Sequence, residues 1–288
     1  MDILWKAAGA AAWGAASLSG LRPFLGAEAA EKLDALCPNG KTVLVGAFPY
    51  YAGDRSGNLS LYCRGEDYHR VLTRRLEQVC EALRAGHPGF RFLPGADSSP
   101  VPELQAAELA GVGVRGRHGL RIVPPYGSYV FLGTILTDWE VAQTGPAKGT
   151  LCPEHCTACR DACPTGALGE DGCDVTKCLS DLTQRKGALS RAETEAICKG
   201  DLIWGCDRCQ RACPHNKKAA LTPIPEFRTN LLDTLSLGDL EGMSNKGFRR
   251  EYADRAFSWR GITPLLRNLR LRAAADRGTA EDTSWKQK

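Results

Sequence analysis

Up to about residue 140, apolar runs alternate with amphipathic stretches, which predicts strands and helices in turn. The continuous apolar run from Thr42 to Pro49 predicts a buried strand that ends at the proline. From Asp67 to Leu83 the apolar side chains fall on one helical stripe, which predicts an amphipathic helix. Shorter apolar segments predict strands at 90–93, 120–123 and 129–132, the last followed by Leu136-Thr-Asp138.

Capping and breaking residues add a helix and divide the chain. Ser99 can cap a helix that begins at Pro100 and ends near Gly111-Val-Gly113, because the missing N–H of proline costs nothing at the first helical position. The whole pattern predicts an α+β chain whose residues 1–148 form an α/β layered domain. A cysteine-rich module at 149–220, reached through the linker 143–149, and a basic helical segment at 221–288 follow.

Composition and the N-terminus indicate the compartment. Thirteen cysteines in a 31.1 kDa chain would suggest disulfides only in a secreted protein. An acid at position 2 and the lack of a long apolar core argue against a signal peptide, so the Ala/Gly-rich stretch after residue 10 is expected to be a helix. No stretch reaches the ~18–20 apolar residues of a membrane span. We therefore expect a cytoplasmic protein with no membrane partner.

Two cysteine runs carry the most specific signal: Cys152-x3-Cys156-x2-Cys159-x3-Cys163-Pro and Cys206-x2-Cys209-x3-Cys213-Pro. In bacterial ferredoxins this cadence delivers three thiolates to one 4Fe–4S cube, and the cysteine of the Cys-Pro pair reaches a second cube. A zinc ribbon is the alternative, since paired Cys-x2-Cys knuckles are its signature. A zinc site with four ligands does not need the additional Cys-Pro cysteine that ends both runs. We therefore expect iron–sulfur clusters, and with them a role in electron transfer.

Two cubes need eight thiolates, and the runs supply seven. The eighth would come from Cys173, Cys178 or Cys198; Cys178 opens Cys-Leu-Ser-Asp-Leu-Thr183, which could begin a helix between the runs. A crossed arrangement would give one cluster Cys152, Cys156, Cys159 and Cys213, and the other Cys163, Cys178, Cys206 and Cys209. The remaining cysteines, Cys37, Cys63 and Cys80, are expected to be small buried hydrophobic residues.

Charge is unevenly placed along the chain. Residues 246–288 hold eleven Lys and Arg against five acids, a net +6, while the whole chain carries +4 and the remainder therefore −2. Arginine concentrated in one segment suits a polyanion such as RNA. A solvated helical face is the alternative interpretation of the same charges.

Several strings resemble the epoxyqueuosine reductase family. The strongest are Gly205-Cys-Asp-Arg-Cys-Gln-Arg-Ala-Cys-Pro-His-Asn216, Cys-Leu-Ser-Asp-Leu-Thr183 and Cys-Pro-Thr-Gly-Ala167. Upstream, Tyr62-Cys-Arg-Gly-Glu-Asp-Tyr-His69, Ala96-Asp-Ser-Ser-Pro-Val101 and Tyr126-Gly-Ser-Tyr-Val-Phe-Leu-Gly-Thr-Ile-Leu-Thr-Asp138 are also similar, as is Arg267-Asn268. The likeness covers about residues 40 to 270; longer members continue into a helical-repeat domain that helps hold tRNA, so the chain is expected to be a short, divergent member.

The resemblance implies the reduction of epoxyqueuosine to queuosine in tRNA by an oxidoreductase with two 4Fe–4S clusters and a cobalamin. It implies Cys178 as the eighth ligand, cobalamin contacts from Arg64, Asp97, Ser128, Ser180 and Asp207, and Asp97 as the proton donor to the departing epoxide oxygen. A carboxylic acid suits that step. A nearby helix N-terminus would lower the pKa of Asp97, so a donor there would need burial to counter the dipole. Flavodoxin or ferredoxin is the expected electron donor, and the protein is expected to be a monomer.

Two departures from the family pattern stand out. Three residues separate Cys152 from Cys156, where the pattern has two, so the loop must bulge or Cys152 is not a ligand. Gly113-Val-Arg-Gly-Arg-His118 replaces the family's Gly-Trp-x-Gly-Lys-Asn. Two other functions stay open: a corrinoid iron–sulfur reductase of a small molecule, similar to the dehalogenases, and a ferredoxin-like electron-transfer protein.

Overall fold

The computed structural model describes residues 1–97, 99–147, 149–170 and 172–276. Its strands are β1 Ala12–Ser17, β2 Thr42–Pro49, β3 Phe92–Gly95, β4 Val114–Arg115, β5 Arg121–Ile122 and β6 Val130–Thr137. Its α-helices are α1 Asp2–Ala7, α2 Leu18–Leu21, α3 Ala27–Leu36, α4 Tyr68–Gly86, α5 Glu103–Leu109, α6 Ala158–Asp161, α7 Leu179–Gln184, α8 Arg191–Lys199, α9 Arg208–Ala212, α10 Leu237–Leu240, α11 Asn245–Glu251 and α12 Thr263–Asp276. Short 3-10 helices include η2 Leu61–Cys63 and η6 Ala256–Arg260.

A four-stranded antiparallel sheet forms the centre of the N-terminal part, in the order β1-β2-β6-β3. The strand predicted at Thr42–Pro49 is confirmed as β2, with every residue buried. Its side chains alternate between two cores, Leu44 and Phe48 on one face and Val43 and Val45 on the other. Burial on both faces explains why the strand is a continuous apolar run.

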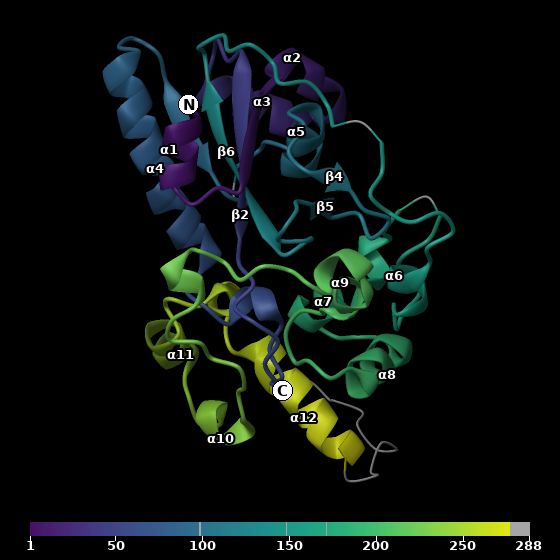
Figure 1. Cartoon of the computed structure of the whole chain (residues 1–288). Helices are drawn as coiled ribbons and strands as arrows, with labels where there is room; N and C mark the ends of the chain where they lie inside the picture. Colours follow the sequence, from purple (N-terminus) through teal and green to yellow (C-terminus); the bar gives the residue numbers. More distant parts are fainter. Residues whose placement is uncertain (98, 148, 171, 277–288) are drawn as a thin grey trace.

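Helices cover both faces of this sheet, as Figure 1 shows. The predicted helix at 67–83 is confirmed as α4, and Asp67 caps it by accepting a hydrogen bond from the N–H of His69. Together α1 and α4 pack on one face, while α2, α3 and α5 pack on the other. The cysteines expected to be buried, Cys37, Cys63 and Cys80, lie in the hydrophobic cores.

The Ala/Gly-rich stretch after residue 10 is a strand, β1, so the prediction of a helix there was wrong. Small residues are needed because α5 packs closely on this edge. A Cβ on Gly14 would lie 2.1 Å from the carbonyl oxygen of Ala110 and 2.7 Å from Thr144 Oγ1. Pairing with β2 and this close approach outweigh the helix preference of alanine.

Three other boundaries differ from the prediction. The strand expected at 90–93 is β3, two residues later, and the segments at 129–132 and 136–138 belong to one strand, β6. The helix does not begin at Pro100 under a Ser99 cap; α5 begins at Glu103, and Ser99 Oγ accepts from the N–H of Val101 instead. A residue before proline is disfavoured in helical conformation, so Pro102 keeps Val101 out of the helix.

The C-terminal half wraps below the sheet in Figure 1 and confirms the α+β class. Trp204, Phe248 and Phe257 centre a third core, and a small fourth core joins α7 and α8 to α12. The basic segment is helical with breaks, as predicted, in α11, η6 and α12; its Arg277, Lys286 and Lys288 lie outside the described residues. Among the described helices, none combines the length and apolarity needed to cross a bilayer.

Candidate metal centre and adjoining cavity

The first set of cysteines gathers four side chains from both runs. Cys152, Cys156, Cys159 and Cys213 line one small cavity between α6 and α9. Burial raises the pKa of the Cys213 thiol, and the neighbouring Cys152 and Cys159 raise it further. The structure therefore brings together the four residues that the crossed arrangement assigns to one cluster.

The extra residue between Cys152 and Cys156 is taken up by His155. Its backbone has φ 58°, in the left-handed region that few non-glycine residues occupy. A turn closed by the Cys156 N–H on the Pro153 carbonyl, 3.1 Å, brings Cys156 back towards the cavity. The Cys152 sulfur also accepts from the N–H of Arg117 at 3.4 Å. The loop thus bulges and leaves Cys152 beside the other three cysteines.

The second set lines a different cavity. Cys163, Cys178, Cys206 and Cys209 line a larger cavity of about 340 Å³, together with Cys173. Burial raises the pKa of Cys209 to about 12, and neighbouring Cys206 and Cys178 add to the shift. Cys198 lies apart, with its thiol donating to the Leu271 carbonyl of α12 at 3.6 Å. Within the described residues, no three His, Cys, Asp or Glu side chains converge on a point that suits a single metal ion.

This larger cavity is mostly apolar and lies between the cysteines and the end of the sheet. Val130 and Phe131 of β6, with Leu120, contribute apolar side chains to its wall. The polar atoms come from Tyr50, Ser60, Tyr62, Ser128, Ser180 and Gln210. His118 lines both this cavity and the small one. Burial lowers the pKa of His118 to about 4 and its Nδ1 accepts from the N–H of Leu120, so the ring is neutral with a proton on Nε2. That Nε2 is buried without a protein partner.

Two of the predicted cofactor contacts lie in the lining, and two lie behind it. Ser128 and Ser180 line the cavity. Asp207 is buried and accepts from Ser60 Oγ and from the N–H of Leu61, 2.9 Å. Arg64 is buried and donates to the carbonyls of Leu59, 2.7 Å, and Arg55, 2.6 Å. In this structure Asp207 and Arg64 bind neighbouring residues behind the cavity lining, at Ser60–Leu61 and at the carbonyls of Leu59 and Arg55, and neither lines the cavity.

Two amides that sequence reasoning left without a role fix the Ser128 end of the wall. Gln210 Nε2 donates to the Ser128 carbonyl at 2.9 Å and to Tyr50 Oη at 3.1 Å. Asn216 Oδ1 accepts from the Ser128 N–H at 2.7 Å, and its Nδ2 donates to Ser128 Oγ at 2.9 Å. Both residues lie inside the Gly205–Asn216 string, and that position is the sequence signal that could have identified them.

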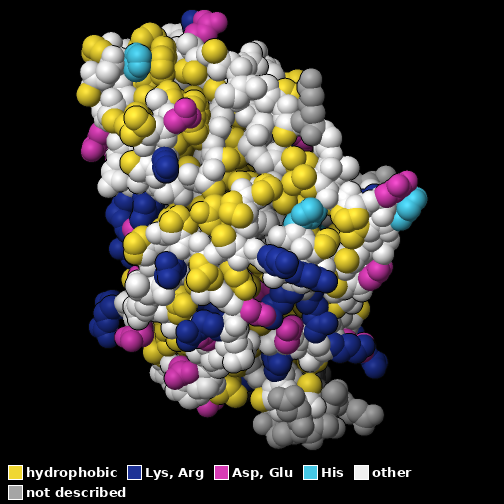
Figure 2. Space-filling view, in the orientation of Figure 1, with side chains coloured by type: hydrophobic (Ala, Val, Ile, Leu, Met, Phe, Trp, Pro, Cys, Tyr) yellow, Lys and Arg dark blue, Asp and Glu magenta, His cyan; other side chains and the backbone are white. Residues whose placement is uncertain are grey.

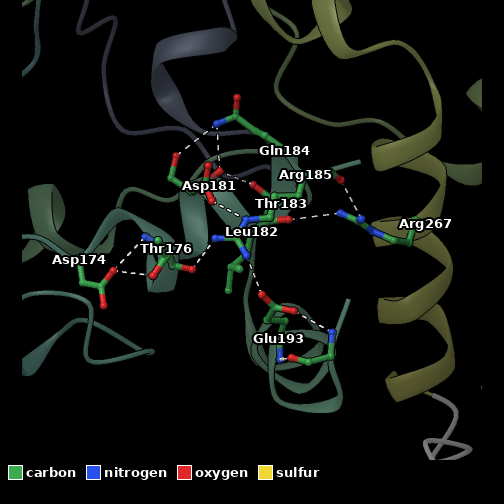
Figure 3. A network of polar contacts seen from close by, with 11 residues as sticks. Asp174, Thr176, Asp181, Leu182, Thr183, Gln184, Arg185, Glu193 and Arg267 are labelled. Atoms are coloured by element: carbon green, nitrogen blue, oxygen red, sulfur yellow. Dashed lines mark hydrogen bonds and ion pairs between the residues drawn. The ribbon is translucent and has the colours of Figure 1, made fainter. Parts of the chain in front are cut away.

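A polar network surrounds α7 between Asp174 and Glu193, as Figure 3 shows. Arg185, at the end of α7, pairs with Asp181 and Glu193 at 2.6 Å each and donates to the carbonyl of Thr176. From α12, Arg267 donates to the carbonyls of Arg185, 2.8 Å, and Leu182, 3.2 Å. The N-cap of α7 is Cys178 itself, so this network fixes its backbone.

The same contacts bear on the basic segment 246–288, whose arginines suit a polyanion such as RNA. Arg267 is one of these arginines, but its guanidinium donates to the carbonyls of Leu182 in α7 and of Arg185 at the end of α7. Arg249 and Arg250 on α11 remain exposed, and Arg270 lies 3.5 Å from Glu241. Figure 2 shows Lys and Arg side chains mostly over the lower half of the molecule, where the cysteine module and the C-terminal segment lie.

Asp97 lies beside the cavity and is linked to its lining through an aromatic side chain. The Tyr68 hydroxyl donates to Asp97 Oδ2 at 2.6 Å, and the Tyr68 ring stacks on Phe131 with centroids 4.2 Å apart. Asp97 has φ 57°, a left-handed backbone, and its N–H donates to Glu103 Oε1 at 2.7 Å. The start of α5 therefore holds the loop that carries Asp97.

His69 bridges two carboxylates. Its Nε2 lies 3.3 Å from Asp97 Oδ2, and its Nδ1 lies 2.7 Å from Asp67 Oδ1. The hydrogen bond from His69 lowers the pKa of Asp97 and outweighs partial burial, with Tyr68 adding to the shift. The pKa of Asp97 is therefore low because of His69 and Tyr68 of α4, and the partial burial of its carboxylate does not offset their effect. Sequence reasoning gave His69 and Glu103 no role and placed Tyr68 only on the apolar stripe of the predicted helix, although Tyr68 and His69 both lie in the Tyr62–His69 string.

Comparisons with known proteins give matches to segments in both halves of the chain. Residues 152–216 match the family model described as 4Fe-4S double cluster binding domain, and residues 31–98 match the model Epoxyqueuosine reductase QueG, DUF1730. The epoxyqueuosine reductase of Lactococcus garvieae is 36% identical over 217 residues, which are 75% of this chain and 61% of that protein. That of Bacillus cereus is 34% identical over 256 residues, 83% of this chain and 65% of that protein. The chain thus spans less than two thirds of the length of these relatives.

Solved structures give the same picture. A selenomethionine-labelled epoxyqueuosine reductase has a TM-score of 0.80 at 28% identity, covering 95% of this chain and 81% of that one. An epoxyqueuosine reductase with an epoxyqueuosine-modified tRNA-Tyr stem loop has a TM-score of 0.78 at 29% identity, covering 96% and 82%. A catabolic reductive dehalogenase, with a TM-score of 0.50 at 16% identity and coverage of 95% and 35%, shares the fold alone.

We expect the purified protein to carry two 4Fe–4S clusters, about eight irons and eight labile sulfides per chain. The two cysteine sets and the double-cluster match at 152–216 motivate this expectation. Iron and acid-labile sulfide are measured after anaerobic purification and reconstitution. Stoichiometric zinc without labile sulfide would contradict the prediction.

Proposed function

The chain belongs to the epoxyqueuosine reductase family, and from this membership and the site geometry we propose that it is an oxidoreductase that reduces epoxyqueuosine to queuosine in tRNA. The observation that carries the proposal is the 340 Å³ cavity, which has four cysteines of one set on one side and Asp97 next to its aromatic wall. In this proposal residues 1–148 hold cobalamin and substrate, 149–220 carry the clusters, and 221–288 contribute to the tRNA surface.

The cavity fits a corrinoid in its chemistry. Its lining is largely apolar with a few hydroxyls, the usual composition of a pocket for a large organic cofactor. Ser60, Ser128 and Ser180 supply the hydroxyls, and the buried Nε2–H of His118 is a donor without a protein partner. Cobalamin, when bound, would supply the electrons that remove the epoxide oxygen. Arg64 and Asp207 would act by keeping the wall in place.

The two cysteine sets would hold the two clusters. Cys152, Cys156, Cys159 and Cys213, beside Arg117, would hold the cluster that accepts electrons from an external donor such as flavodoxin or ferredoxin. Cys163, Cys178, Cys206 and Cys209 would hold the cluster beside the cavity. We propose that the protein works as a monomer in the cytoplasm, where its tRNA substrate would be found.

Asp97 is the proposed proton donor to the substrate. Removing an epoxide oxygen as water takes two electrons and two protons, so an acid must stand beside that oxygen. Asp97 is held in place at three points, by Tyr68 and His69 on its carboxylate and by Glu103 on its N–H. The low pKa of Asp97 means that its carboxyl must receive each proton before passing it on.

We expect the exposed arginines of α11 to bind tRNA phosphate. Replacing Arg249 and Arg250 with Ala should weaken tRNA binding and flatten its salt dependence by roughly one unit of slope per lost contact. Nearby, Trp259 is 54% exposed and carries the Arg260 guanidinium over its ring at 3.8 Å, a pair suited to stacking on RNA bases. Dissociation constants measured across a salt series test the prediction.

The matched control removes two exposed cations, Arg22 directly after α2 and Lys32 in α3. Figure 1 shows α2 and α3 at the opposite end of the molecule from α11. If the control and the α11 variant show the same slope as the unchanged protein, the α11 arginines belong to a solvated surface. Arg267 is left intact in both variants, because its loss would disturb α7.

Anaerobic reconstitution followed by metal, sulfide and corrinoid analysis, and then by turnover of epoxyqueuosine tRNA, tests the whole proposal. Full cofactor loading with turnover supports it. Full loading without tRNA turnover would favour a corrinoid reductase of a small molecule. Two clusters without corrinoid binding would favour an electron-transfer protein.

A further inference from the structure

Asp97 has a low pKa and is mostly a carboxylate at neutral pH, so a proton donor in this position needs a supply of protons. Among the described residues, three side chains form hydrogen bonds with Asp97. Tyr68 and His69 reach its carboxylate through the same oxygen, Oδ2, while Glu103 reaches only its backbone N–H. The supply must therefore come through one of the first two or directly from solvent.

Tyr68 is unsuited to the supply. Burial raises the pKa of its phenol, and the hydrogen bond to the Asp97 carboxylate raises it further. The phenol therefore keeps its proton and serves as a fixed donor that orients Oδ2. Glu103, whose pKa burial raises to about 7, holds the loop through the N–H of Asp97 and has no hydrogen bond to its carboxylate.

We propose that His69 is a proton relay, which takes protons from solvent and passes them from Nε2 to Asp97 while Asp67 holds Nδ1. The proposal rests on the function proposed above and deepens it. The His69 side chain is 33% exposed, so water can reach the ring, whereas Asp67 is 17% exposed and keeps the ring in one orientation. His69 acts through Asp97 and is a positioning residue, not one that touches the substrate.

The proton balance closes without another reactant. In the resting state His69 is an imidazolium with N–H bonds to both Asp67 and Asp97. The Nε2–H bond breaks as an O–H bond forms on Asp97 Oδ2, and that O–H bond then breaks as the substrate oxygen takes the proton. Neutral His69 keeps the proton on Nδ1, which stays hydrogen-bonded to Asp67. Its Nε2 then regains a proton from solvent. No electrons move in these steps.

The groups around His69 set the pH range of the relay. Asp67 and Asp97 face its two nitrogens, the Tyr68 ring stacks on it at 4.0 Å, and Glu103 lies behind Asp97. Partial burial acts to lower the pKa of His69, but the two carboxylates overcome it and raise the pKa to about 9. The relay is therefore loaded at neutral pH and is emptied as the pH rises through about 9.

The test is single turnover of epoxyqueuosine tRNA by pre-reduced, fully loaded protein between pH 6 and about pH 10, compared with His69→Gln. Glutamine can hydrogen-bond but cannot relay a proton. We expect the unchanged protein to lose rate above about pH 9, and His69→Gln to be at least ~10-fold slower at neutral pH without that basic limb. Added imidazole should restore part of the rate in His69→Ala.

Two controls separate structure from proton transfer. Iron, sulfide and corrinoid content should be unchanged in His69→Gln, and His87→Gln, a histidine that packs on Trp139 at 3.9 Å, should behave as the unchanged protein. Normal rate and a retained basic limb in His69→Gln would overturn the relay. Lack of turnover by the unchanged protein would overturn the proposed function instead.

A second measurement needs no turnover. In protein with labelled histidine, the His69 resonance, identified by its loss in His69→Gln, should titrate near pH 9 and shift to lower pH in Asp97→Asn. An ordinary titration near ~6.5, unchanged by Asp97→Asn, would show that the ring does not bridge the two carboxylates and would overturn the relay.

Discussion

Asp97→Asn is expected to lower turnover of epoxyqueuosine tRNA by about 10²–10⁴-fold while both clusters and cobalamin stay bound. Asparagine has nearly the same size and still accepts a hydrogen bond from the Tyr68 hydroxyl, but it cannot carry a proton to the substrate. Its backbone also suits the site, because Asn tolerates the left-handed conformation that Asp97 adopts at φ 57°. The measurement is single turnover by the loaded protein, with cofactor content determined on the same sample.

The matched control is Asp34→Asn, which removes a carboxylate from an exposed pair with Arg22 on the far side of the sheet. Exposed ion pairs contribute little to stability, so this variant should keep full activity. Near-normal turnover in Asp97→Asn would remove Asp97 from the mechanism. Loss of clusters or cobalamin in that variant would show that the residue holds the site rather than supplies a proton.

The parts of the fold that the sequence predicted well are those where burial dominates. β2 is apolar on both faces and α4 on one stripe, and each pattern admits one interpretation. The start of α5 was misplaced because Ser99 and Pro100 form a good helix start by themselves, and Pro102 cancels it. β1 was missed because its glycine and alanines reflect close packing against the Ala110 region rather than local preference.

The cysteine spacing predicted that the thiols within each run lie close together, because a short run fixes the geometry within a few residues, but it left the eighth thiol open between Cys173, Cys178 and Cys198. The surroundings of Asp97 could not be predicted in this way. Tyr68 and His69 come from the start of α4 and Glu103 from α5, and pairing of β3 with β6 carries the Asp97 loop to them. Arg267 shows the same limit, since its charge is visible in the sequence but its carbonyl partners on α7 are not.

The second large effect is expected for Cys178→Ser, which should lose one cluster, about half of the iron, together with turnover. Cys173 and Cys178 both line the cavity, and their thiols are neighbours, so proximity does not choose between them. The difference between them is how firmly the backbone is held. Cys178 lies at the N-cap position of α7, and α7 is fixed by Leu179 and Leu182 in a small core and by the network around Arg185.

Cys173, in contrast, is exposed and forms an isolated β-bridge with Leu168. A ligand held in place before the metal binds loses less conformational freedom on binding, which favours Cys178. Cys173→Ser is therefore the matched control and should keep about eight irons and full turnover. Loss of a cluster in Cys173→Ser but not in Cys178→Ser would reverse the assignment. Because the second cysteine set opens into the cavity, Cys178→Ser should stop turnover even while the first cluster still accepts electrons.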